Sequence, residues 1–224
     1  YFNMVGFKLG QDENGDFSEN RSLSVLQKYA AEIGLDKKTG IEITESAPQV
    51  SNSYAVPSYI GQGTNAYTTS QLARYATAIA TSGNVYDLTL LDRQTNSKGE
   101  TLKEYEPDII NTVDVSQNVW DDIHDGMYRV VQTHKQFDGL GVDVAGKTGT
   151  AEVNIYHPNH GMFIGYAPAS DPEYAIAVRI ENGYTSGNAC LAADEIFKYI
   201  FELADEKSIL TGVAASDTSD TSND

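Results

Sequence analysis

Basic residues are scarce in this sequence. Its 224 residues include 15 lysines and arginines against 32 aspartates and glutamates, which gives a formal net charge of −17. Proteins that bind nucleic acid carry clustered Lys and Arg to neutralise phosphates. We therefore expect no nucleic-acid partner, and we interpret the acidic balance as a source of solubility.

The sequence also lacks a long apolar run and has little cysteine. No stretch of about 18 apolar residues occurs, so no segment is predicted to span a membrane. A secretory signal would have a basic segment followed by an apolar one, and the sequence shows no such pattern. The single cysteine, Cys190, cannot form an internal disulfide, and we interpret it as a small buried residue. Because the chain begins with Tyr1, we expect a processed chain or a piece of a longer protein, any membrane anchor being upstream.

The residues that are present are typical of a folded domain. Hydrophobic residues make up 40% of the chain and aromatic residues 10%, as in globular proteins. Apolar residues recur with helical spacing in five segments: 1–9, 22–33, 68–82, 116–132 and 189–203. Residues 44–62 predict a long loop. We expect a folded portion over residues 1–206 and a disordered acidic tail over 207–224.

The apolar positions also predict which face of each helix is buried. The expected inner residues are Phe2, Val5 and Leu9 in the first helix, Val119, Ile123, Met127, Val130 and Val131 in the fourth, and Ile196, Phe197, Ile200 and Phe201 in the last. Any of Thr68, Thr69 and Ser70 is a suitable cap for the third helix. Residues 88–91 and 104–112 predict short extended pieces around a polar turn at 96–99.

Three β-rich segments follow one another near the end of the chain. They cover residues 142–155, 161–167 and 173–181 and are separated by turn sequences, which predicts an antiparallel meander. Helices followed by a small antiparallel sheet and a closing helix indicate an α+β fold.

The first of these strands contains an unusual stretch, VAGKTGTAEV at residues 144–153. Gly149 would let a ligand backbone approach the sheet edge. Lys147 would supply positive charge, Thr148 and Thr150 hydroxyls for a carboxylate, and the Thr150 N–H a donor to an oxyanion. This set suits acyl transfer on a substrate that ends in a carboxylate. The alternative is a plain strand with a bulge at Gly149 and a solvent-facing lysine.

The surroundings of this stretch favour the first interpretation. GKTGTAE at 146–152 resembles the third motif of penicillin-binding proteins and serine β-lactamases. HGMFIGYAP at 160–168, IGQGTNAYTTSQLARYATAIATSGNVY at 60–86 and the opening YFNMVGFKLG resemble, in order, other parts of the transpeptidase branch, although Thr69-Ser70 replaces its usual Thr-Pro. The resemblance runs to about residue 205 and favours the class B, monofunctional transpeptidases. It implies the penicillin-binding protein/serine β-lactamase-like fold, an antiparallel sheet flanked by helices, incomplete in this chain.

The resemblance implies a peptidoglycan D,D-transpeptidase that cross-links the bacterial cell wall without cofactor or metal. A serine would attack the D-Ala-D-Ala bond of a stem peptide, and β-lactams would bind the same site. Lys147 would relay protons, Thr148 and Thr150 would hold the terminal carboxylate, Gly149 would leave room for the substrate, and the Thr150 N–H would form half of the oxyanion hole. The place of action implied is the outer face of the cytoplasmic membrane, with an N-terminal anchor outside this chain.

Two expected motifs are missing or misplaced. No serine is followed three residues later by lysine, as S-x-x-K requires; Ser24 precedes Lys28 by four. Ser116-Gln117-Asn118 matches S-x-N in letters only, since it heads a predicted helix before K-T-G, and we interpret Ser116 as a helix N-cap. We therefore expect the C-terminal portion of a transpeptidase domain, inactive alone and completed by the upstream portion of the same domain. Without that portion it would expose a large apolar surface.

Other functions compete with this one. A β-lactamase or D,D-carboxypeptidase would lack the loop and helix pattern of residues 60–86. A catalytically silent binding or assembly fragment fits the missing S-x-x-K, and ligand binding without turnover would distinguish it. The segment Tyr184–Asn188 follows the third strand and is a candidate substrate contact.

Several polar clusters have simpler explanations than a functional site. His157 and His160 are three residues apart, which is weak evidence for a metal, and we assign them to a surface turn and to the histidine position of the family that the sequence resembles. The acidic group Asp121, Asp122 and Asp125 lacks calcium-loop spacing and is expected on a solvated helix face. We expect Trp120 in the core rather than in a sugar site.

Overall fold

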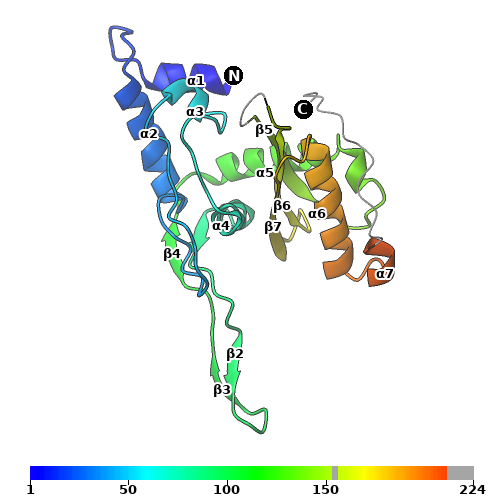
Figure 1. Ribbon diagram of the computed structural model, residues 1–224. Helices are drawn as coiled ribbons and strands as arrows, with labels where there is room; N and C mark the ends of the chain where they lie inside the picture. Colours follow the sequence, from blue (N-terminus) through cyan, green and yellow to red (C-terminus); the bar gives the residue numbers. More distant parts are fainter. Residues whose placement is uncertain (153–155, 211–224) are drawn as a thin grey trace. The chain divides into compact units, whose positions relative to one another are not determined.

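The computed structural model describes residues 1–152 and 156–210 of the chain (Figure 1). The chain divides into two compact units. The first contains Tyr1–Ala78 and Gly83–Asp114, and the second contains Ile79–Ser82 and Val115–Asp224. The α+β composition predicted from the sequence is confirmed.

The first unit is mainly helical. Its helices are α1 (Phe2–Leu9), α2 (Glu19–Glu32), α3 (Ala55–Ser58) and α4 (Thr69–Ala80), the last of which runs past the unit boundary. Its strands are β1 (Asn84–Tyr86), β2 (Arg93–Thr95), β3 (Thr101–Glu104) and β4 (Ile109–Thr112). They form two antiparallel pairs, β1 with β4 and β2 with β3. The predicted loop over 44–62 is therefore interrupted by one short helix, α3.

Side-chain caps set where the longer helices of this unit begin. The Ser18 hydroxyl accepts from the Arg21 N–H at 3.4 Å, so α2 starts earlier than the predicted residue 22. At α4 the Thr68 hydroxyl accepts from the Gln71 N–H at 3.2 Å, and Gln71 Oε1 accepts from the Thr68 N–H at 2.9 Å. This reciprocal pair is a capping box, and it selects Thr68 from the three candidate caps.

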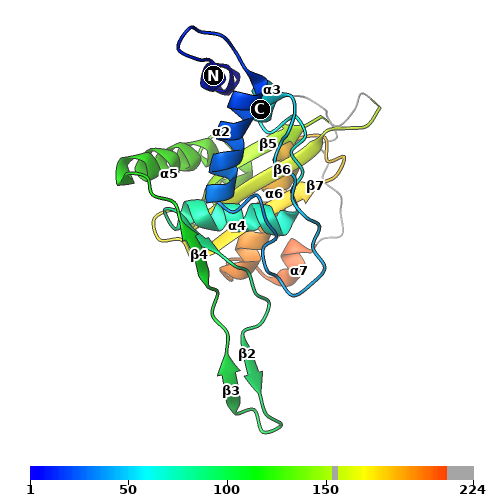
Figure 2. The ribbon, with the colours of Figure 1, turned by 90° about the vertical axis from the view of Figure 1, so that its left-hand side faces the viewer.

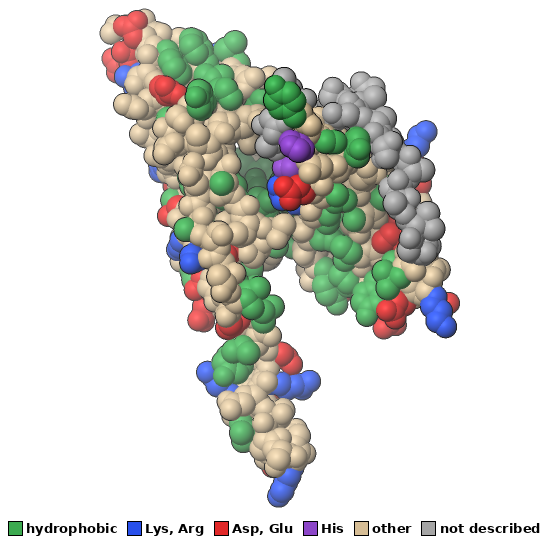
Figure 3. All heavy atoms as spheres, in the orientation of Figure 1, with side chains coloured by type: hydrophobic (Ala, Val, Ile, Leu, Met, Phe, Trp, Pro, Cys, Tyr) green, Lys and Arg blue, Asp and Glu red, His purple; other side chains and the backbone are tan. Residues whose placement is uncertain are grey.

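The predicted buried face of α1 is wrong. Phe2 and Leu9 are 59% and 39% exposed, and the buried residue of the helix is Gly6. A Cβ on Gly6 would lie 2.4 Å from Cδ2 of Tyr59, so the glycine is what allows this ring to pack on the helix. Apolar periodicity missed this face because a glycine beneath an aromatic ring adds no apolar side chain to the pattern. Figure 3 shows hydrophobic side chains gathered over this helix.

The segment from 84 to 112 is only partly as predicted. The first strand is β1, and residues 88–91 are irregular instead of extended. The polar turn is confirmed, since the Asn96 N–H donates to Glu100 O at 3.0 Å and closes the β2–β3 hairpin. All residues of these two strands are exposed, and Figure 2 shows the hairpin extending away from the β1–β4 pair of its unit.

The second unit holds the predicted meander. Its strands β5 (Ala145–Ala151), β6 (His160–Ala167) and β7 (Tyr174–Ile180) form an antiparallel sheet in the order β5-β6-β7. Its helices are α5 (Gln117–Val131), η1 (Lys135–Phe137), α6 (Ser186–Ile200) and α7 (Glu206–Ile209). Residues 153–155 of the predicted first β segment lie outside the described residues.

Helices α5 and α6 lie on opposite faces of this sheet (Figures 1 and 2). Phe163 of β6 packs with Phe197 of α6 in the main apolar core. Tyr166 has the opposite parity along β6, and its ring meets the His124 ring of α5 edge-on, with centroids 5.8 Å apart. Strand alternation therefore sends one set of β6 side chains toward each helix.

The helix faces of this unit need two corrections. In α5 the buried residues are Trp120, Met127 and Val131, whereas Val119 is 44% exposed. In α6, which begins at 186 and not at 189, Ile196 is 40% exposed. The buried positions of α6 are Ser186, Ala189, Cys190, Ala193, Asp194 and Phe197. Small residues dominate this list because the helix lies close to the sheet, and small side chains carry little apolar signal.

The remaining expectations can be placed briefly. Cys190 and Trp120 are buried, as predicted. No helix in the described ranges is both long and apolar enough for a membrane crossing. The predicted tail over 207–224 begins inside α7, and residues 211–224 lie outside the described residues.

Candidate active site

The K-T-G stretch occupies β5, at one edge of the sheet of the second unit. Lys147 is paired with Ile164, Thr148 with Phe163, and Gly149 with Met162 of β6. The register continues without a shift to Ala151, so the alternative of a bulge at Gly149 is wrong. Within the described residues β5 has β6 as its only strand neighbour, and its other edge carries no strand.

The side chains of β5 alternate between the two faces of the sheet. Thr150 lies on the face covered by α6, where its Oγ1 accepts from the Ser186 N–H at 3.2 Å. By alternation Thr148 shares that face, and Lys147 and Gly149 share the other. Lys147 is exposed, and its Nζ donates to Thr148 O at 2.7 Å. Thr148 is 9% exposed.

Gly149 differs from the neighbouring glycines of β5 and β6. A Cβ on Gly146 would lie 2.3 Å from Phe163 Cζ, one on Gly161 would lie 2.3 Å from Thr185 O, and one on Gly165 would lie 2.6 Å from Ala145 O. At Gly149 the nearest atom would be Met162 Cβ at 3.6 Å, an ordinary contact. Packing within the described chain therefore explains three of these glycines but gives no reason for Gly149.

The predicted segment Tyr184–Asn188 contributes the start of α6 beside this strand. Thr185 is the N-cap of the helix, and its hydroxyl accepts from the Gly187 N–H at 2.8 Å. Ser186 comes next and donates its amide to Thr150. The sequence placed this segment near the site but gave no sign of the Thr150–Ser186 hydrogen bond, because 36 residues separate its partners.

His160 begins β6 opposite Ala151. It is 8% exposed, and its Nδ1 accepts from the Asn182 N–H at 3.0 Å. The neutral tautomer with its proton on Nε2 is the one that accepts in this way. Residues 1–152 and 156–210 hold no group of three or more metal-ligating side chains. In the structure, His160 joins the start of β6 to Asn182, two residues beyond the end of β7.

Neither of the two candidate serines makes a described contact that suits a nucleophile. Ser116 is at the N-cap position of α5, as predicted, although its side chain makes no capping hydrogen bond with the described residues. Ser24 lies on α2 in the other unit and donates to Asn20 O at 2.7 Å. Across the described ranges, Lys147 Nζ has no hydrogen bond to a serine hydroxyl.

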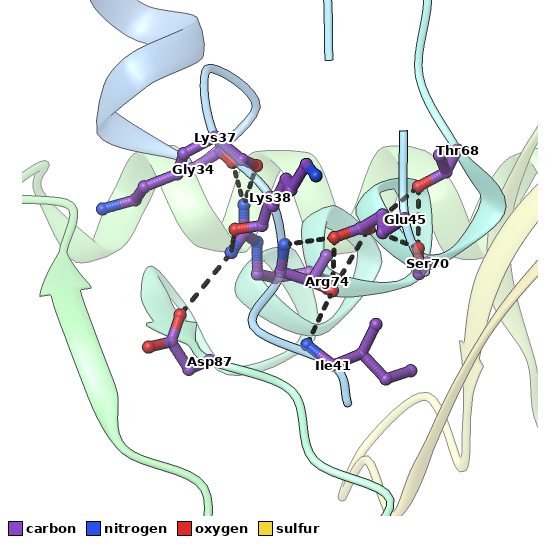
Figure 4. Close-up of polar contacts among 10 residues, drawn as sticks. Gly34, Lys37, Lys38, Ile41, Glu45, Thr68, Ser70, Arg74 and Asp87 are labelled. Atoms are coloured by element: carbon purple, nitrogen blue, oxygen red, sulfur yellow. Dashed lines mark hydrogen bonds and ion pairs between the residues drawn. The ribbon is translucent and has the colours of Figure 1, made fainter. Parts of the chain in front are cut away.

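The 60–86 stretch supplies a buried polar network, which sequence reasoning missed. Figure 4 shows Arg74 of α4, 1% exposed, pointing at a set of backbone carbonyls. Its guanidinium donates to Lys38 O at 2.9 Å, to Lys37 O at 2.7 Å and to Gly34 O, and it lies 3.8 Å from an Asp87 carboxylate oxygen. Burial lowers the pKa of Arg74, and nearby carboxylates, that of Asp87 first, oppose this effect. Arg74 thus satisfies carbonyls just beyond the end of α2.

Glu45 forms the second half of this network. Its carboxylate accepts from Thr68 Oγ1 at 3.0 Å and from Ser70 Oγ at 2.5 Å (Figure 4). It also accepts from the Thr39 N–H at 2.7 Å. Burial alone would raise the pKa of Glu45, but the hydrogen bonds from Ser70, Thr39 and Thr68 together lower it. The loop from 35 to 45 is thereby attached to the first turn of α4.

Comparison with known proteins identifies the family. The family model of the penicillin binding protein transpeptidase domain matches residues 1–202. Penicillin-binding protein 2B of Streptococcus pneumoniae is 29% identical over 177 residues, which cover 70% of this chain and 26% of that protein. Peptidoglycan D,D-transpeptidase MrdA of Acinetobacter baumannii is 27% identical over 236 residues, which cover 89% of this chain and 32% of that protein. The chain thus spans about a quarter to a third of these curated relatives.

A solved structure supports the same fold. Penicillin-binding protein A from M. tuberculosis, solved as a ceftriaxone acyl-enzyme complex, superimposes with a TM-score of 0.73 at 24% identity and covers 91% of this chain and 46% of that one. The α+β fold implied by the resemblance, with antiparallel sheets flanked by helices, is confirmed. With a family model matching residues 1–202 and a fold that agrees, this chain belongs to the penicillin-binding protein transpeptidase domain family.

Proposed function

We propose that this chain is the K-T-G portion of a peptidoglycan D,D-transpeptidase. A serine oxygen attacks the carbonyl of the penultimate D-Ala of a stem peptide, and the new ester bond replaces the amide bond to the terminal D-Ala. The departing amine takes up a proton. An amine of a second stem then attacks the ester, which forms the cross-link and returns the serine. The D,D-transpeptidase name of MrdA and the ceftriaxone acyl-enzyme of penicillin-binding protein A support this reaction class.

The positions of the β5 residues along the edge strand support the roles that the resemblance implies for them. Lys147 is exposed on the edge strand. Its positive charge would attract the carboxylate of the substrate, and its amine would relay protons. Thr148 and Thr150 offer hydroxyls to the terminal carboxylate of the substrate or of a β-lactam. The Thr150 N–H is half of the oxyanion hole.

The observation that carries this proposal is the glycine at 149. It lies in the edge strand, and the nearest described atom to its missing Cβ would be 3.6 Å away. A glycine costs strand stability through its backbone entropy. Packing within the described chain does not account for this cost. Close approach of a ligand backbone would account for it.

The nucleophile is proposed to lie outside this chain, because no serine here has a lysine three residues later. The upstream portion of the same domain would supply both the S-x-x-K serine and the S-x-N motif. We place the whole protein at the extracytoplasmic face of the cytoplasmic membrane, where its substrate is, with an anchor outside these residues.

A labelling experiment tests the proposal. The purified sample is incubated with a fluorescent penicillin, and every polypeptide present is examined by denaturing gel and intact mass. We expect no adduct on this chain and a labelled upstream polypeptide wherever one co-purifies. A covalent adduct on the 224-residue chain itself would show that the nucleophile has been wrongly placed.

A catalytically silent binding fragment is the second candidate, and the missing S-x-x-K is what favours it. It predicts that the chain binds a peptide ending in D-Ala-D-Ala reversibly. It also predicts that no co-purifying polypeptide takes up the penicillin label. Because both candidates predict peptide binding at β5, the gel separates them, and isothermal titration with that peptide checks that the binding site is intact.

A further inference from the structure

The contact between Thr150 and the first turn of α6 goes beyond the roles assigned so far. Thr150 Oγ1 accepts from the Ser186 N–H at 3.2 Å. Threonine is branched at Cβ, so a single torsion, χ1, decides where its hydroxyl lies. A hydrogen bond that holds Oγ1 therefore selects the rotamer of the side chain.

The Ser186 amide is held in place independently of Thr150. Thr185 caps the helix by accepting from the Gly187 N–H at 2.8 Å. Gly161, which is paired with Thr150 in the sheet, has no Cβ, and one placed there would lie 2.3 Å from Thr185 O. This glycine is what lets α6 begin directly against the β5–β6 pair. The donor that meets Thr150 is thus part of a capped helix start that packs directly against the sheet.

The donor is the main-chain amide of Ser186 and not its hydroxyl. The Ser186 side chain is fully buried, and its Oγ has no hydrogen-bond partner among the described residues. Changing the side chain alone should leave the contact with Thr150 intact. This separates the contribution of the backbone from that of the serine identity.

We propose that the Ser186 N–H is a positioning group for substrate recognition by Thr150. A hydroxyl has one proton and two lone pairs. Accepting from Ser186 occupies a lone pair and, through χ1, fixes the position from which the Thr150 hydroxyl meets the terminal carboxylate of the substrate. This inference rests on the proposed function, because it assumes that Thr150 binds that carboxylate.

A proline at 186 removes the donor at little cost to the helix. Ser186 is the first residue of α6, where proline is well tolerated. The preceding residue, Thr185, has φ −137° and ψ 156°, the extended conformation that proline requires of its neighbour. Ser186→Pro deletes the N–H and puts a ring carbon toward Thr150 Oγ1. Ser186→Ala is the matched control, because it keeps the N–H and removes the unpartnered hydroxyl.

The first measurement needs no ligand. Three-bond NMR couplings of Thr150 report its χ1 distribution. We expect one dominant rotamer in the wild-type chain and in Ser186→Ala, and a changed distribution in Ser186→Pro. Rotamer averaging already present in the wild-type chain would overturn the inference, whatever the site binds.

The second measurement uses two peptides that end in D-Ala-D-Ala, one with a free carboxylate and one with a C-terminal amide. Their dissociation constants are measured by NMR titration. We expect the preference for the free acid to fall about three- to tenfold in Ser186→Pro, the size of one net hydrogen bond. Ser186→Ala should keep the wild-type preference, and melting curves of both variants report their folding.

A double-variant cycle separates positioning from general damage to the site. In a Thr150→Val background the hydroxyl is gone, so Ser186→Pro should cause no further loss of preference. A loss that persists in this background, or an undiminished preference in Ser186→Pro, refutes the inference and leaves the proposed function standing. Equal binding of both peptides by the wild-type chain refutes the carboxylate role of Thr150, and with it both proposals.

Discussion

Ser70 Oγ donates a hydrogen bond of 2.5 Å to Glu45 Oε1. With the bonds from Thr39 and Thr68, it stabilises the ionised form of the buried carboxylate in the folded chain relative to the unfolded one. The pKa of Glu45 is consequently lowered from its ordinary value of 4.5, even though burial pushes it upward. A group with a lowered pKa stabilises the fold above its unfolded pKa, and this stabilisation is lost as the pH falls.

The first prediction concerns this pH dependence. The wild-type chain should lose unfolding free energy as the pH falls below about 4.5, and Glu45→Gln should flatten that part of the curve. At pH 7 the variant should be less stable by about 1–3 kcal/mol, since an amide nitrogen faces donors such as the Thr39 N–H. Urea titrations from pH 3 to pH 7 measure both effects. An unchanged pH profile would mean that other carboxylates govern acid unfolding.

Arg74 gives the second prediction. Its guanidinium serves the carbonyls of Gly34, Lys37 and Lys38 at once, and a lysine ammonium lacks that planar set of donors. Arg74→Lys should therefore lower the unfolding free energy by about 2–4 kcal/mol, because buried carbonyls lose their partners. Urea denaturation measures the loss.

The control for Arg74 is its ion-pair partner. The side chain of Asp87 is 50% exposed and lies 3.8 Å from Arg74 Nη1, so solvent screens the pair. Asp87→Asn should cost less than about 1 kcal/mol. If Asp87→Asn lowered the unfolding free energy as much as Arg74→Lys, the ion pair and not the carbonyl contacts would be the main contribution of Arg74 to stability.

The buried pair in α6 gives the third prediction. Asp194 is 3% exposed, and its carboxylate lies 2.5 Å from Lys198 Nζ. Burial raises the pKa of Asp194, and the hydrogen bond and charge of Lys198 oppose the rise. Lys198→Met leaves the carboxylate without that cation and should cost about 1–3 kcal/mol at pH 7, the smaller end because Lys198 is partly exposed.

The sign of the pH effect is opposite to that at Glu45. A carboxyl whose pKa is raised by folding destabilises the fold once the pH exceeds its unfolded pKa. The difference between Lys198→Met and the wild-type chain should therefore be small at pH 3 and reach its full size by pH 7. Asp194→Asn in the Lys198→Met background is the control and should remove the pH dependence of that difference.

Periodicity in the sequence predicted the helices and the meander but not every helix face. The β5-β6-β7 order followed from three adjacent β-rich segments with short connections. The buried side of α1 did not, because Tyr59 packs on Gly6, and packing on a glycine leaves no periodic signal. β1 was misplaced by a few residues for a related reason, as only Val85 of its three residues is buried.

The candidate site was predictable where its residues are contiguous and not where they are brought together by folding. Lys147, Thr148, Gly149 and Thr150 form one motif, and its edge-strand position agrees with the expectation. The Thr150–Ser186, Glu45–Thr68 and Arg74–Gly34 hydrogen bonds join residues that are 36, 23 and 40 positions apart. A single side chain such as Glu45 has no local sequence pattern from which its distant partners could be predicted.

The last prediction contrasts two glycines of one sheet. A Cβ on Gly161 would lie 2.3 Å from Thr185 O, a backbone atom, so Gly161→Ala should destabilise the chain by about 1–3 kcal/mol or more. At Gly149 the nearest contact would be 3.6 Å, and alanine suits a strand better than glycine. Gly149→Ala should therefore change the unfolding free energy by less than about 0.5 kcal/mol.

Although Gly149→Ala should hardly change stability, it should weaken ligand binding. A methyl group on the edge strand stands where the substrate backbone is proposed to lie, so Gly149→Ala should weaken binding of a D-Ala-D-Ala peptide by about 1–3 kcal/mol. Denaturant unfolding and peptide titration on the same samples give both quantities. If Gly149→Ala keeps both its stability and its affinity, the glycine has no part in binding, and the observation that carries the proposed function fails. A variant that is stable but does not bind would instead place the substrate against this strand.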